Sequence, residues 1–169
     1  MDIKLRAGTA ADAEACGKIC YHAFTTIAKA HNFTSDFPSE DIAIGLIKSL
    51  LSHPGFYSVV AEFDGRIVGS NFLDERSAIA GLGPITVDPN VQNRSVGRQL
   101  MENAHERTAA KKFPGVRLIQ AGYHTRSLSL YAKLGYDVRE PLACIQGQAL
   151  NKTVAGCTAR SAGDSDVDA

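Results

Sequence analysis

A pattern typical of a phosphate-binding site spans residues 83–101. Its first part, Ile85-Thr86-Val87, is an apolar run typical of a buried strand, and Asp88-Pro89-Asn90 ends that run with turn residues. A polar loop follows, and the apolar spacing predicts an amphipathic helix that begins near Gly97. The first N–H groups of a helix lack internal partners and carry partial positive charge, so this order of elements can bind an anion. An ordinary connection with a solvated basic loop has the same order, and this stretch alone leaves both interpretations open.

Two arginines add formal charge to the same loop. Arg94 lies within it, and Arg98 lies at the start of the predicted helix. A guanidinium group can donate two parallel hydrogen bonds to a phosphate. The anion that this charge favours is therefore a diphosphate.

A second group of polar side chains lies at residues 124–136. His124 and Ser127 are three residues apart, which places them on adjacent turns of one helix face. Tyr131 lies on the same predicted helix, and a phenol with an ordinary pKa near 10 is a proton donor at neutral pH. Tyr131 therefore fits two roles, a general acid or a side chain of the core, and helical aromatic residues usually have the second.

Side chains that could accept a proton lie elsewhere. Asp74 and Glu75 follow the third predicted strand, where a carboxylate could take an amine proton directly or through water. The alternative for both is a solvated turn. His22 and His31 flank the loop between the first two predicted helices, and each fits a surface histidine better than a catalyst.

The composition limits the classes of partner. The chain has 169 residues, which suits one domain, and its 18 basic and 18 acidic residues give a net charge of zero. This balance gives no electrostatic reason to expect nucleic acid or an anionic membrane as a partner. No apolar run approaches the roughly 20 residues of a membrane span, and the N-terminus lacks a signal-peptide core, so we expect a cytoplasmic protein. The cysteines lack zinc-site spacing, so no metal is expected, and Cys16 and Cys20 suit neighbours on one helix face better than a disulfide.

The hydrophobic periodicity predicts an α/β (α+β) domain with a mixed sheet and helices on its faces. Residues 1–150 form the predicted domain, and residues 151–169, small, polar and acidic, form a flexible tail. Thr9 with Asp12, and Ser39, are predicted to cap the first two helices. The predicted order is a strand at 3–6, helices at 9–30 and 39–52, strands at 57–63, 66–73 and 79–87, a helix at 97–112, a strand at 116–121, a helix at 124–134, a strand that starts at 136–138 and a further one at 143–145.

This order and two motifs resemble the GNAT family of acetyl-CoA-dependent N-acetyltransferases. The first motif is the pyrophosphate loop Gln/Arg-x-x-Gly-x-Gly/Ala, which reads Gln92-Asn93-Arg94-Ser95-Val96-Gly97 here. The second is Asn-x-x-Ser/Ala-x-x-Leu-Tyr-x-Lys-x-Gly-Phe/Tyr, which is similar to residues 124–136. The likeness covers about residues 3–147. It implies a GNAT-like, mainly antiparallel sheet of six or seven strands with about four helices, acetyl-CoA as the acyl donor without a metal, and an amine acceptor.

The resemblance also implies roles for individual residues. The strand at residues 85–87 would pair with the pantetheine arm, and the N–H groups of residues 92–97 would hold the diphosphate. Tyr131 would be the general acid, and Glu75 is the candidate general base. A homodimer could form through the C-terminal strand, because edge strands often pair. The expected cofactor-binding residues are Ile85, Thr86, Val87, Gln92, Asn93, Arg94, Ser95, Val96, Gly97, Arg98, His124, Ser127 and Tyr131.

Two positions depart from the family motifs. Ser95 replaces the first glycine of the loop, and if that position needs a positive φ, serine costs about 1 kcal/mol or more. Its Cβ could crowd a phosphate, or its hydroxyl could donate to one. His124 replaces asparagine, and a histidine there can still bind the cofactor in the right tautomer.

The predicted function is transfer of an acetyl group to a primary amine of a small molecule or peptide, by direct transfer in a ternary complex. The alternative is a non-catalytic acyl-CoA-binding module that acts as a sensor or regulator. The acceptor is not encoded in a motif. Phe33, Phe37 and Tyr57 suggest a partly apolar wall, which argues weakly against a highly cationic acceptor.

Overall fold

The computed structural model describes residues 2–144, 147–148, 152–161, 163 and 166. These residues divide into two compact units, 1–136 and 137–169. The elements of the first unit, in chain order, are β1 (Lys4–Ala7), the 3₁₀ turn η1 (Ala10–Asp12), α1 (Ala13–Ala30), α2 (Glu40–Ser52), β2 (Phe56–Phe63), β3 (Arg66–Asp74), β4 (Ala80–Leu82), β5 (Thr86–Val87), the 3₁₀ turn η2 (Pro89–Val91), α3 (Val96–Ala110), β6 (Val116–Arg117) and α4 (Thr125–Lys133).

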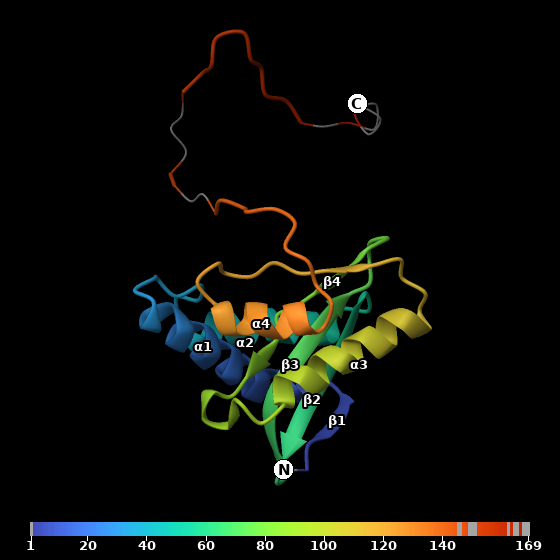
Figure 1. The fold of residues 1–169 in the computed structure, drawn as a ribbon. Coiled ribbons are helices and arrows are strands. Elements are labelled where there is room, and N and C mark those ends of the chain that lie inside the picture. Colours follow the sequence, from blue (N-terminus) through green and yellow to red (C-terminus); the bar gives the residue numbers. More distant parts are fainter. Residues whose placement is uncertain (1, 145–146, 149–151, 162, 164–165, 167–169) are drawn as a thin grey trace. The chain divides into compact units, whose positions relative to one another are not determined.

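The six strands form one mixed sheet (Figure 1). Strands β1, β2, β3 and β4 pair antiparallel in that order, and β6 pairs parallel with β4. Strands β4 and β5 both pair antiparallel with the same edge of β3: β4 lies opposite residues 73–74 and β5 lies opposite residues 69–70. The predicted mixed, mainly antiparallel sheet with four helices is confirmed.

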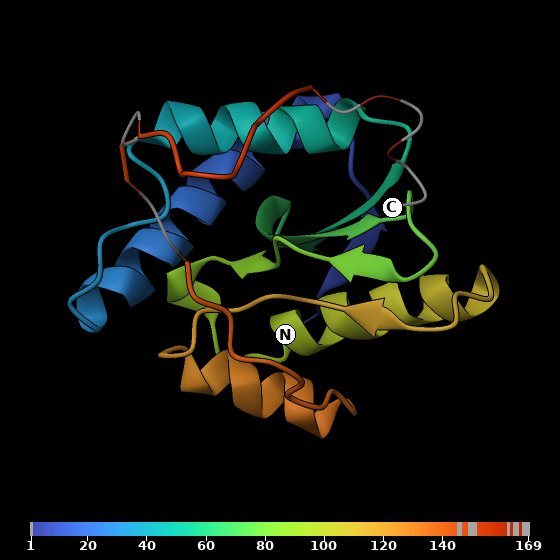
Figure 2. The ribbon, with the colours of Figure 1, turned by 90° about the horizontal axis from the view of Figure 1, so that it is seen from above.

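The helices cover both faces of the sheet (Figure 2). On one face, Phe72 and Val60 pack with Ile47 of α2 and with Cys16 and Cys20 of α1. Both cysteines are buried and free, as the sequence predicts. On the other face α3 and α4 pack through two clusters, Val59, Ala61, Val68, Val91, Val96 and Leu100, and Leu73, Ala80, Leu82, Met101, Ala104 and Tyr131. No helix in the described part of the chain is both long and apolar enough to cross a membrane.

The predicted caps fix the starts of the first two helices. The buried Asp12 carboxylate accepts hydrogen bonds from the Thr9 N–H and hydroxyl at 2.7 and 2.9 Å. It also accepts two bonds of 2.8 Å from Arg6, and this guanidinium lowers the pKa of Asp12 to about 2. Ser39 accepts from the Ile42 N–H at the start of α2.

Two predicted strands are broken or shortened in the structure. The strand expected at 79–87 is two strands, because Pro84 has no N–H to donate and Gly83 has φ +123°. The strand expected at 116–121 pairs only over its first two residues, since its partner β4 ends at Leu82.

The strand expected to start at 136–138 is wrong, because residues 136–138 form no strand. Val138 is 76% exposed, so no apolar face holds it in a sheet. Of the strand expected at 143–145, residues 143 and 144 are irregular and residue 145 lies outside the described residues. A dimer contact through these residues therefore stays a prediction without an observed strand.

The second unit, residues 137–169, contains no α-helix or β-strand among its described residues. Its main polar contact is a two-bond pair in which Arg160 donates to Asp166 at 2.6 and 2.7 Å. The first compact unit ends at Tyr136, and the domain end predicted at residue 150 stays a prediction. The flexible tail at 151–169 stays a prediction.

Candidate functional site

Strand β5 has one open edge. Its other edge faces β3, where Asp88 N donates to Val68 O at 2.9 Å and Thr86 is opposite Ser70. Hydrogen bonds of an antiparallel pair alternate along the strand, so the peptide groups of Val87 and Ile85 face away from β3. No described strand covers that edge, since β6 pairs with β4 instead. The Ile85 peptide groups and the Val87 N–H, which are predicted to bind a pantetheine arm, therefore face an unpaired edge, whereas Val87 O accepts from Gln92 Nε2 at 3.2 Å.

The N-terminus of α3 presents unpaired N–H groups beside this edge. The first α-helical bond runs from Gln99 N to Ser95 O at 3.0 Å, so the N–H groups of Val96, Gly97 and Arg98 have no acceptor inside the helix. The Val96 side chain is buried in the core, so this residue can offer a ligand only its backbone. The helix dipole adds partial positive charge at this end.

Ser95 has the left-handed conformation that the motif's glycine implies. Its φ and ψ are 64° and 5°, and its side chain makes no capping hydrogen bond. The condition on which the cost of serine depends, a positive φ at residue 95, is therefore met. The strain that a β-carbon carries in this region therefore applies here.

Gly97 marks the point where the loop, β5 and α4 meet. A β-carbon built on Gly97 would lie 3.6 Å from Leu130 Cδ2 and 3.8 Å from Val87 Cγ2, which are ordinary contacts. The protein itself therefore has room for alanine at this position. Glycine also makes a helix about 0.5–1 kcal/mol less stable than alanine does, so neither packing nor helix stability explains the glycine. A bare backbone here suits the close approach of a ligand.

Gln92 ties these elements together. Its Nε2 donates to Val87 O at 3.2 Å, and its Oε1 accepts from Arg126 of α4. Arg126 is a site residue that the sequence analysis missed. A signal was available, because a cation in the first turn of a helix opposes the helix dipole and suggests an anion nearby.

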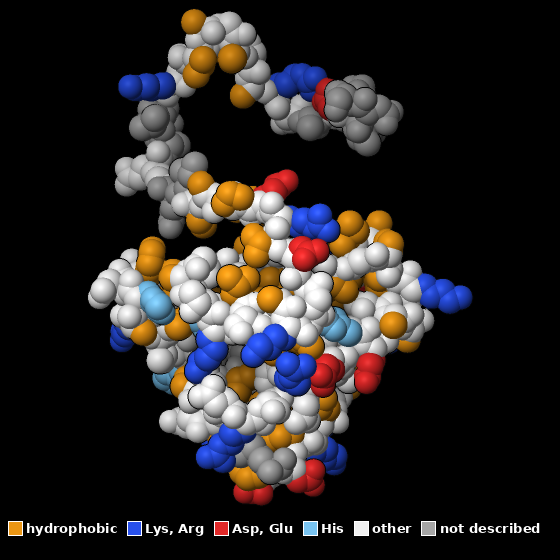
Figure 3. Space-filling view, in the orientation of Figure 1, with side chains coloured by type: hydrophobic (Ala, Val, Ile, Leu, Met, Phe, Trp, Pro, Cys, Tyr) orange, Lys and Arg blue, Asp and Glu red, His pale blue; other side chains and the backbone are white. Residues whose placement is uncertain are grey.

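The predicted arginines lie on the surface near this junction. Arg94 is exposed, and Arg98 lies 3.4 Å from Glu102 Oε1, one turn along α3. Figure 3 shows Lys and Arg side chains gathered over the region between the start of α3 and α4. Asn93 has a positive φ of 66° and is exposed. This surface can attract a diphosphate.

Tyr131 is buried on the inner face of α4. Its ring is 7% exposed, packs with Leu73 and Met101, and lies 5.9 Å from the ring of Tyr136. Burial raises the pKa of Tyr131, and a hydrogen bond with the Ser127 side chain opposes that change in part. The side chain is therefore a neutral phenol at pH 7. Ser127, a predicted cofactor contact, faces Tyr131 one turn away.

His124 is the N-cap of α4, where its side chain makes no capping hydrogen bond. Burial lowers the pKa of His124, and the nearby positive charge of Arg126 lowers it further. The imidazole is therefore neutral at pH 7, with one nitrogen that can donate and one that can accept.

The structure holds Glu75 apart from the loop. Its carboxylate accepts from Arg107 Nε at 2.6 Å and Nη2 at 3.0 Å, and this bond lowers the pKa of Glu75. Residue 107 is ten residues beyond Gly97, about 15 Å along α3 at 1.5 Å per residue. Asp74 is bound to Arg76 in the same way, which lowers the pKa of Asp74 to about 2.

The predicted apolar wall does not form. Phe37 is partly buried and packs against Phe24 beside the cluster of Cys16 and Ile47, and Tyr57 donates to Asn103 Oδ1 at 2.8 Å on the α3 side. Only Phe33 stays on the surface, 57% exposed, where it stacks on Tyr123 with ring centres 4.5 Å apart. The contact of Tyr123 with Phe33 could not be predicted from the sequence, because only the fold brings the turn of Tyr123 beside the loop after α1.

The histidines of that region have partners as well. His31 stacks on Tyr123 at 5.3 Å, and His22 Nε2 lies 3.1 Å from Glu40 Oε1. Neither observation tests a catalytic role.

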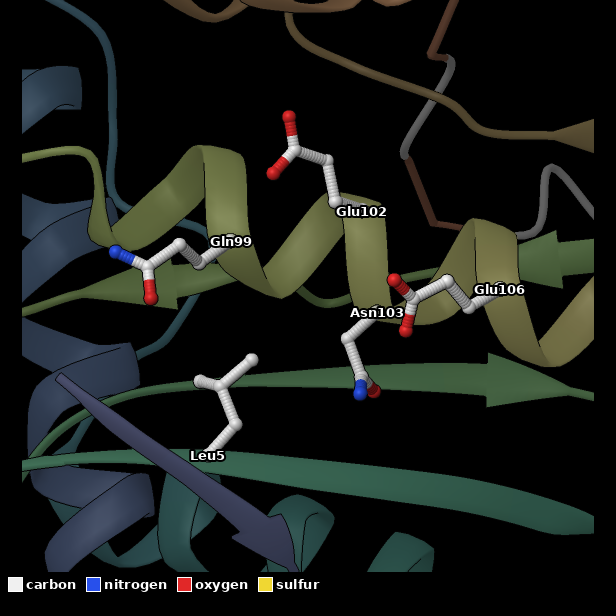
Figure 4. A pocket seen from close by; sticks show the side chains of 5 residues that line it. All are labelled: Leu5, Gln99, Glu102, Asn103 and Glu106. Carbon is white, nitrogen blue, oxygen red and sulfur yellow. The ribbon is translucent and has the colours of Figure 1, made fainter.

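Two hollows among the described residues include neither Tyr131 nor the 92–97 loop. The first, about 200 Å³, lies between β1 and α3, and Figure 4 shows Leu5 rising from β1 toward the helix. Its two glutamates would repel phosphate. The second is about 420 Å³ and includes the turn just before the loop. The first is lined by Leu5, Gln99, Glu102, Asn103 and Glu106, and the second by Lys18, Ile19, His22, Thr26, Asp88, Pro89 and Asn90.

Comparisons with known proteins agree with this geometry. The model of the acetyltransferase (GNAT) domain family matches residues 54–138. No curated protein matches the sequence. Three solved structures share the fold at low identity.

The first is the PaiA N-acetyltransferase of Thermoplasma acidophilum in complex with coenzyme A, with a TM-score of 0.72, 18% identity, and 83% of this chain and 93% of that chain covered. The second is AAC(6')-Iy in complex with a bisubstrate analogue, CoA-S-monomethyl-acetylneamine, with a TM-score of 0.68, 15% identity, and coverage of 88% and 100%. The third is an acetyltransferase of Trypanosoma brucei, with a TM-score of 0.60, 22% identity, and coverage of 86% and 99%.

Proposed function

The chain belongs to the GNAT acetyltransferase domain family, and from this premise we propose that it transfers the acetyl group of acetyl-CoA to a primary amine of a small molecule or peptide. The transfer is direct, in a ternary complex of enzyme, acetyl-CoA and amine. PaiA in its coenzyme A complex and AAC(6')-Iy in its bisubstrate complex share this fold.

The observation that carries the proposal is the junction at Gly97. The open edge of β5, the unpaired N–H groups of α3 and the first turns of α4 meet there, where Gly97 has no side chain and Leu130 and Val87 lie beside it. An acyl-CoA has a partner for each of these groups. Its anionic diphosphate suits the N–H groups of α3, and the amides of its pantetheine arm suit the edge of β5. Arg94 and Arg98 add formal charge for the diphosphate.

Three groups of this chain fit such a substrate. The N–H groups of residues 96–98 would hold the diphosphate, and the peptide groups of Ile85 with the Val87 N–H would pair with pantetheine amides. His124 and Ser127 on α4 complete the set with polar side chains at its first turns. The substrate supplies the thioester, an acetyl group activated for attack by nitrogen.

Tyr131 supplies the proton that the reaction needs. The lone pair of a neutral amine attacks the carbonyl carbon, a carbon–nitrogen bond forms, and the carbon–sulfur bond breaks with its electrons on sulfur. The phenol O–H of Tyr131 donates its proton to that sulfur. The new amide nitrogen loses one proton, which restores the phenol through solvent. Burial keeps the Tyr131 phenol protonated until sulfur gains charge, because it raises the pKa.

Glu75 stays a prediction as the general base. Because Arg107 lowers the pKa of Glu75, the acid limb of a rate profile that depends on Glu75 falls below pH 4.5. If the amine instead arrives neutral and no base is needed, kcat/KM falls as the pH drops below the pKa of the amine itself. The pH dependence of kcat/KM therefore separates the two routes.

The test compares Tyr131→Phe with the wild type in a thiol-release assay over a panel of amines, amino acids, polyamines and peptides. We expect kcat to fall about 10²–10⁴-fold, because a positioned acid is lost, and the acetyl-CoA Kd to change less than about 3-fold. The matched control is Tyr136→Phe, which removes a neighbouring phenol bonded to His105 Nε2 at 2.9 Å and leaves kcat unchanged.

An unchanged kcat in Tyr131→Phe overturns its role as the acid. A wild type that binds acetyl-CoA in calorimetry but releases no thiol with any amine supports the second candidate, a non-catalytic acyl-CoA sensor. The burial of Tyr131 in the core is the observation that favours that candidate.

A further inference from the structure

Asn71 is a polar side chain that is buried on the central strand β3. It is 1% exposed, and both ends of its carboxamide are hydrogen-bonded. Its Oδ1 accepts from the Phe72 N–H at 2.9 Å, and its Nδ2 donates to the carbonyl of Leu100 in α3 at 3.1 Å. These two bonds join β3 to the helix whose first turn is the candidate diphosphate site.

The gap between β4 and β5 explains the first of these bonds. Strand β4 lies opposite residues 73–74 and β5 lies opposite residues 69–70, so neither strand is paired with Phe72. The Phe72 carbonyl accepts from Gly83 N at 2.8 Å, and the N–H of the same residue points to the same side of an antiparallel strand. A buried N–H without an acceptor is costly, and Asn71 supplies the acceptor where the ladder is interrupted.

Gly69 makes room for the same turn of α3. A β-carbon built on Gly69 would lie 2.7 Å from Thr86 O and 3.2 Å from Leu100 Cδ1, and the first of these contacts is too short for any side chain. Residues two apart on a strand share a face, so Gly69 and Asn71 both face α3. Strand β5 and the first turns of α3 can therefore both lie against β3 at this point.

The bond from Asn71 fixes the position of α3 more narrowly than the apolar contacts do. Val96 and Leu100 pack in an apolar cluster, and apolar surfaces keep most of their contact when they slide by a fraction of an ångström. A hydrogen bond to one carbonyl is directional, and single buried polar groups can fix register in this way at a cost in stability. This bond is therefore the contact that specifies where α3 lies along β3.

The position of Leu100 also determines the position of the diphosphate-binding turn. Leu100 is three residues beyond Gly97, which is about 4.5 Å along the helix axis at 1.5 Å per residue. We propose that Asn71 is a positioning residue, which acts through α3 to hold the N–H groups of residues 96–98 where they bind the diphosphate of the acyl donor. This inference rests on the proposed function.

The test compares the wild type with Asn71→Leu, which has a similar volume and removes both hydrogen bonds. Acetyl-CoA is the probe in calorimetry, and we expect it to bind about 5–20-fold more weakly to the variant, because displaced N–H groups make poorer bonds to a charged phosphate. In two-dimensional NMR spectra, the amide proton signals of residues 96–98 should move to lower field when acetyl-CoA saturates the wild type, as an N–H that donates to phosphate does. In the saturated variant they should move less than about half as far.

The matched control is Val60→Ala, which opens a space in the core on the other face of the sheet, where Val60 packs with Ile47. This variant should unfold at a lower urea concentration than the wild type. Its acetyl-CoA affinity and the amide shifts of residues 96–98 should nevertheless equal those of the wild type, because no contact with α3 is changed. If Asn71→Leu is not folded by circular dichroism, Asn71→Ala is measured in its place, since it removes the same two bonds without added bulk.

Equal acetyl-CoA affinity of Asn71→Leu and wild type overturns the proposal. Weaker binding with unchanged amide shifts also overturns it, as does an equal loss of affinity in Val60→Ala, because each of these results describes a general loss of stability. If the wild type does not bind acetyl-CoA, the proposed function itself fails, which is a different result.

Discussion

Replacing Ser95 by glycine should stabilise the protein. Ser95 has φ 64°, where a β-carbon costs about 1–2 kcal/mol, and its side chain makes no capping bond that glycine would lose. Glycine gives back about 0.4–1 kcal/mol, because it makes the unfolded chain more flexible. The net gain is about 0.5–1 kcal/mol. For a chain of this size that gain raises Tm by about 1–4 °C.

The assay is urea unfolding at pH 7, with Ser95→Ala as the matched control. Alanine lacks the hydroxyl and keeps the β-carbon at positive φ, so its stability stays within about 0.5 kcal/mol of the wild type. Asn93→Gly is a second control at φ 66°. It should gain less than Ser95→Gly, because asparagine tolerates this region better than serine.

Acetyl-CoA titrations of the same variants decide what the serine does for the ligand. If the hydroxyl donates to a phosphate, both Ser95→Ala and Ser95→Gly bind about 10-fold more weakly. If the β-carbon crowds a phosphate, only Ser95→Gly binds more tightly. The backbone argument is refuted if Ser95→Gly is no more stable than Ser95→Ala.

Three further changes have predictable effects. Gly97→Ala should raise the free energy of unfolding in urea by about 0.5–1 kcal/mol, because the protein has room for the methyl group and alanine favours a helix. The same variant should bind acetyl-CoA at least 10-fold more weakly in calorimetry, because the ligand must approach the backbone at this position. A lower free energy of unfolding or an unchanged affinity would contradict this. Asp12→Asn should lose about 2 kcal/mol at pH 7, because Arg6 lowers the pKa of Asp12 from 3.8 to about 2. That contribution is present above pH 3.8 and disappears as pH falls to about 2, so urea unfolding at pH 7 and pH 2.5 should show a smaller difference at the lower pH. Glu75→Gln should lower the free energy of unfolding by less than about 1 kcal/mol, because its partner Arg107 is partly exposed. If Glu75 is the general base, the same variant also loses kcat in the thiol-release assay, and Arg107→Gln does not.

The parts of the fold that follow local signals were predictable. Asp12 accepts from the Thr9 N–H at the start of η1, and Ser39 accepts from the Ile42 N–H at the start of α2. Each bond joins residues three apart in the sequence, so a local pattern is enough to predict it. The Asp64-Gly65 turn between β2 and β3 has positive φ at both residues, as a tight hairpin requires. These features need no knowledge of the rest of the chain.

Strand ends were less predictable, because a strand ends where its partner ends. Residues 118–121 have the composition of a strand, but β4 stops at Leu82 and leaves them unpaired. That termination depends on Pro84, which has no N–H for a ladder. The strand prediction for residues 118–121 was therefore wrong for a reason that lies in another part of the chain.

The candidate site also has features that depend on local sequence and features that depend on the fold. The loop motif determines the backbone conformation, and residue 95 has a positive φ, as a glycine position would, although it is serine. The side-chain partners join residues far apart in sequence, such as Arg126 with Gln92 and Arg107 with Glu75, and no local pattern records them. A ligand that binds mainly backbone N–H groups therefore tolerates substitutions such as Ser95. The amine acceptor must be bound by side chains, and its identity depends on the contacts that only the fold assembles.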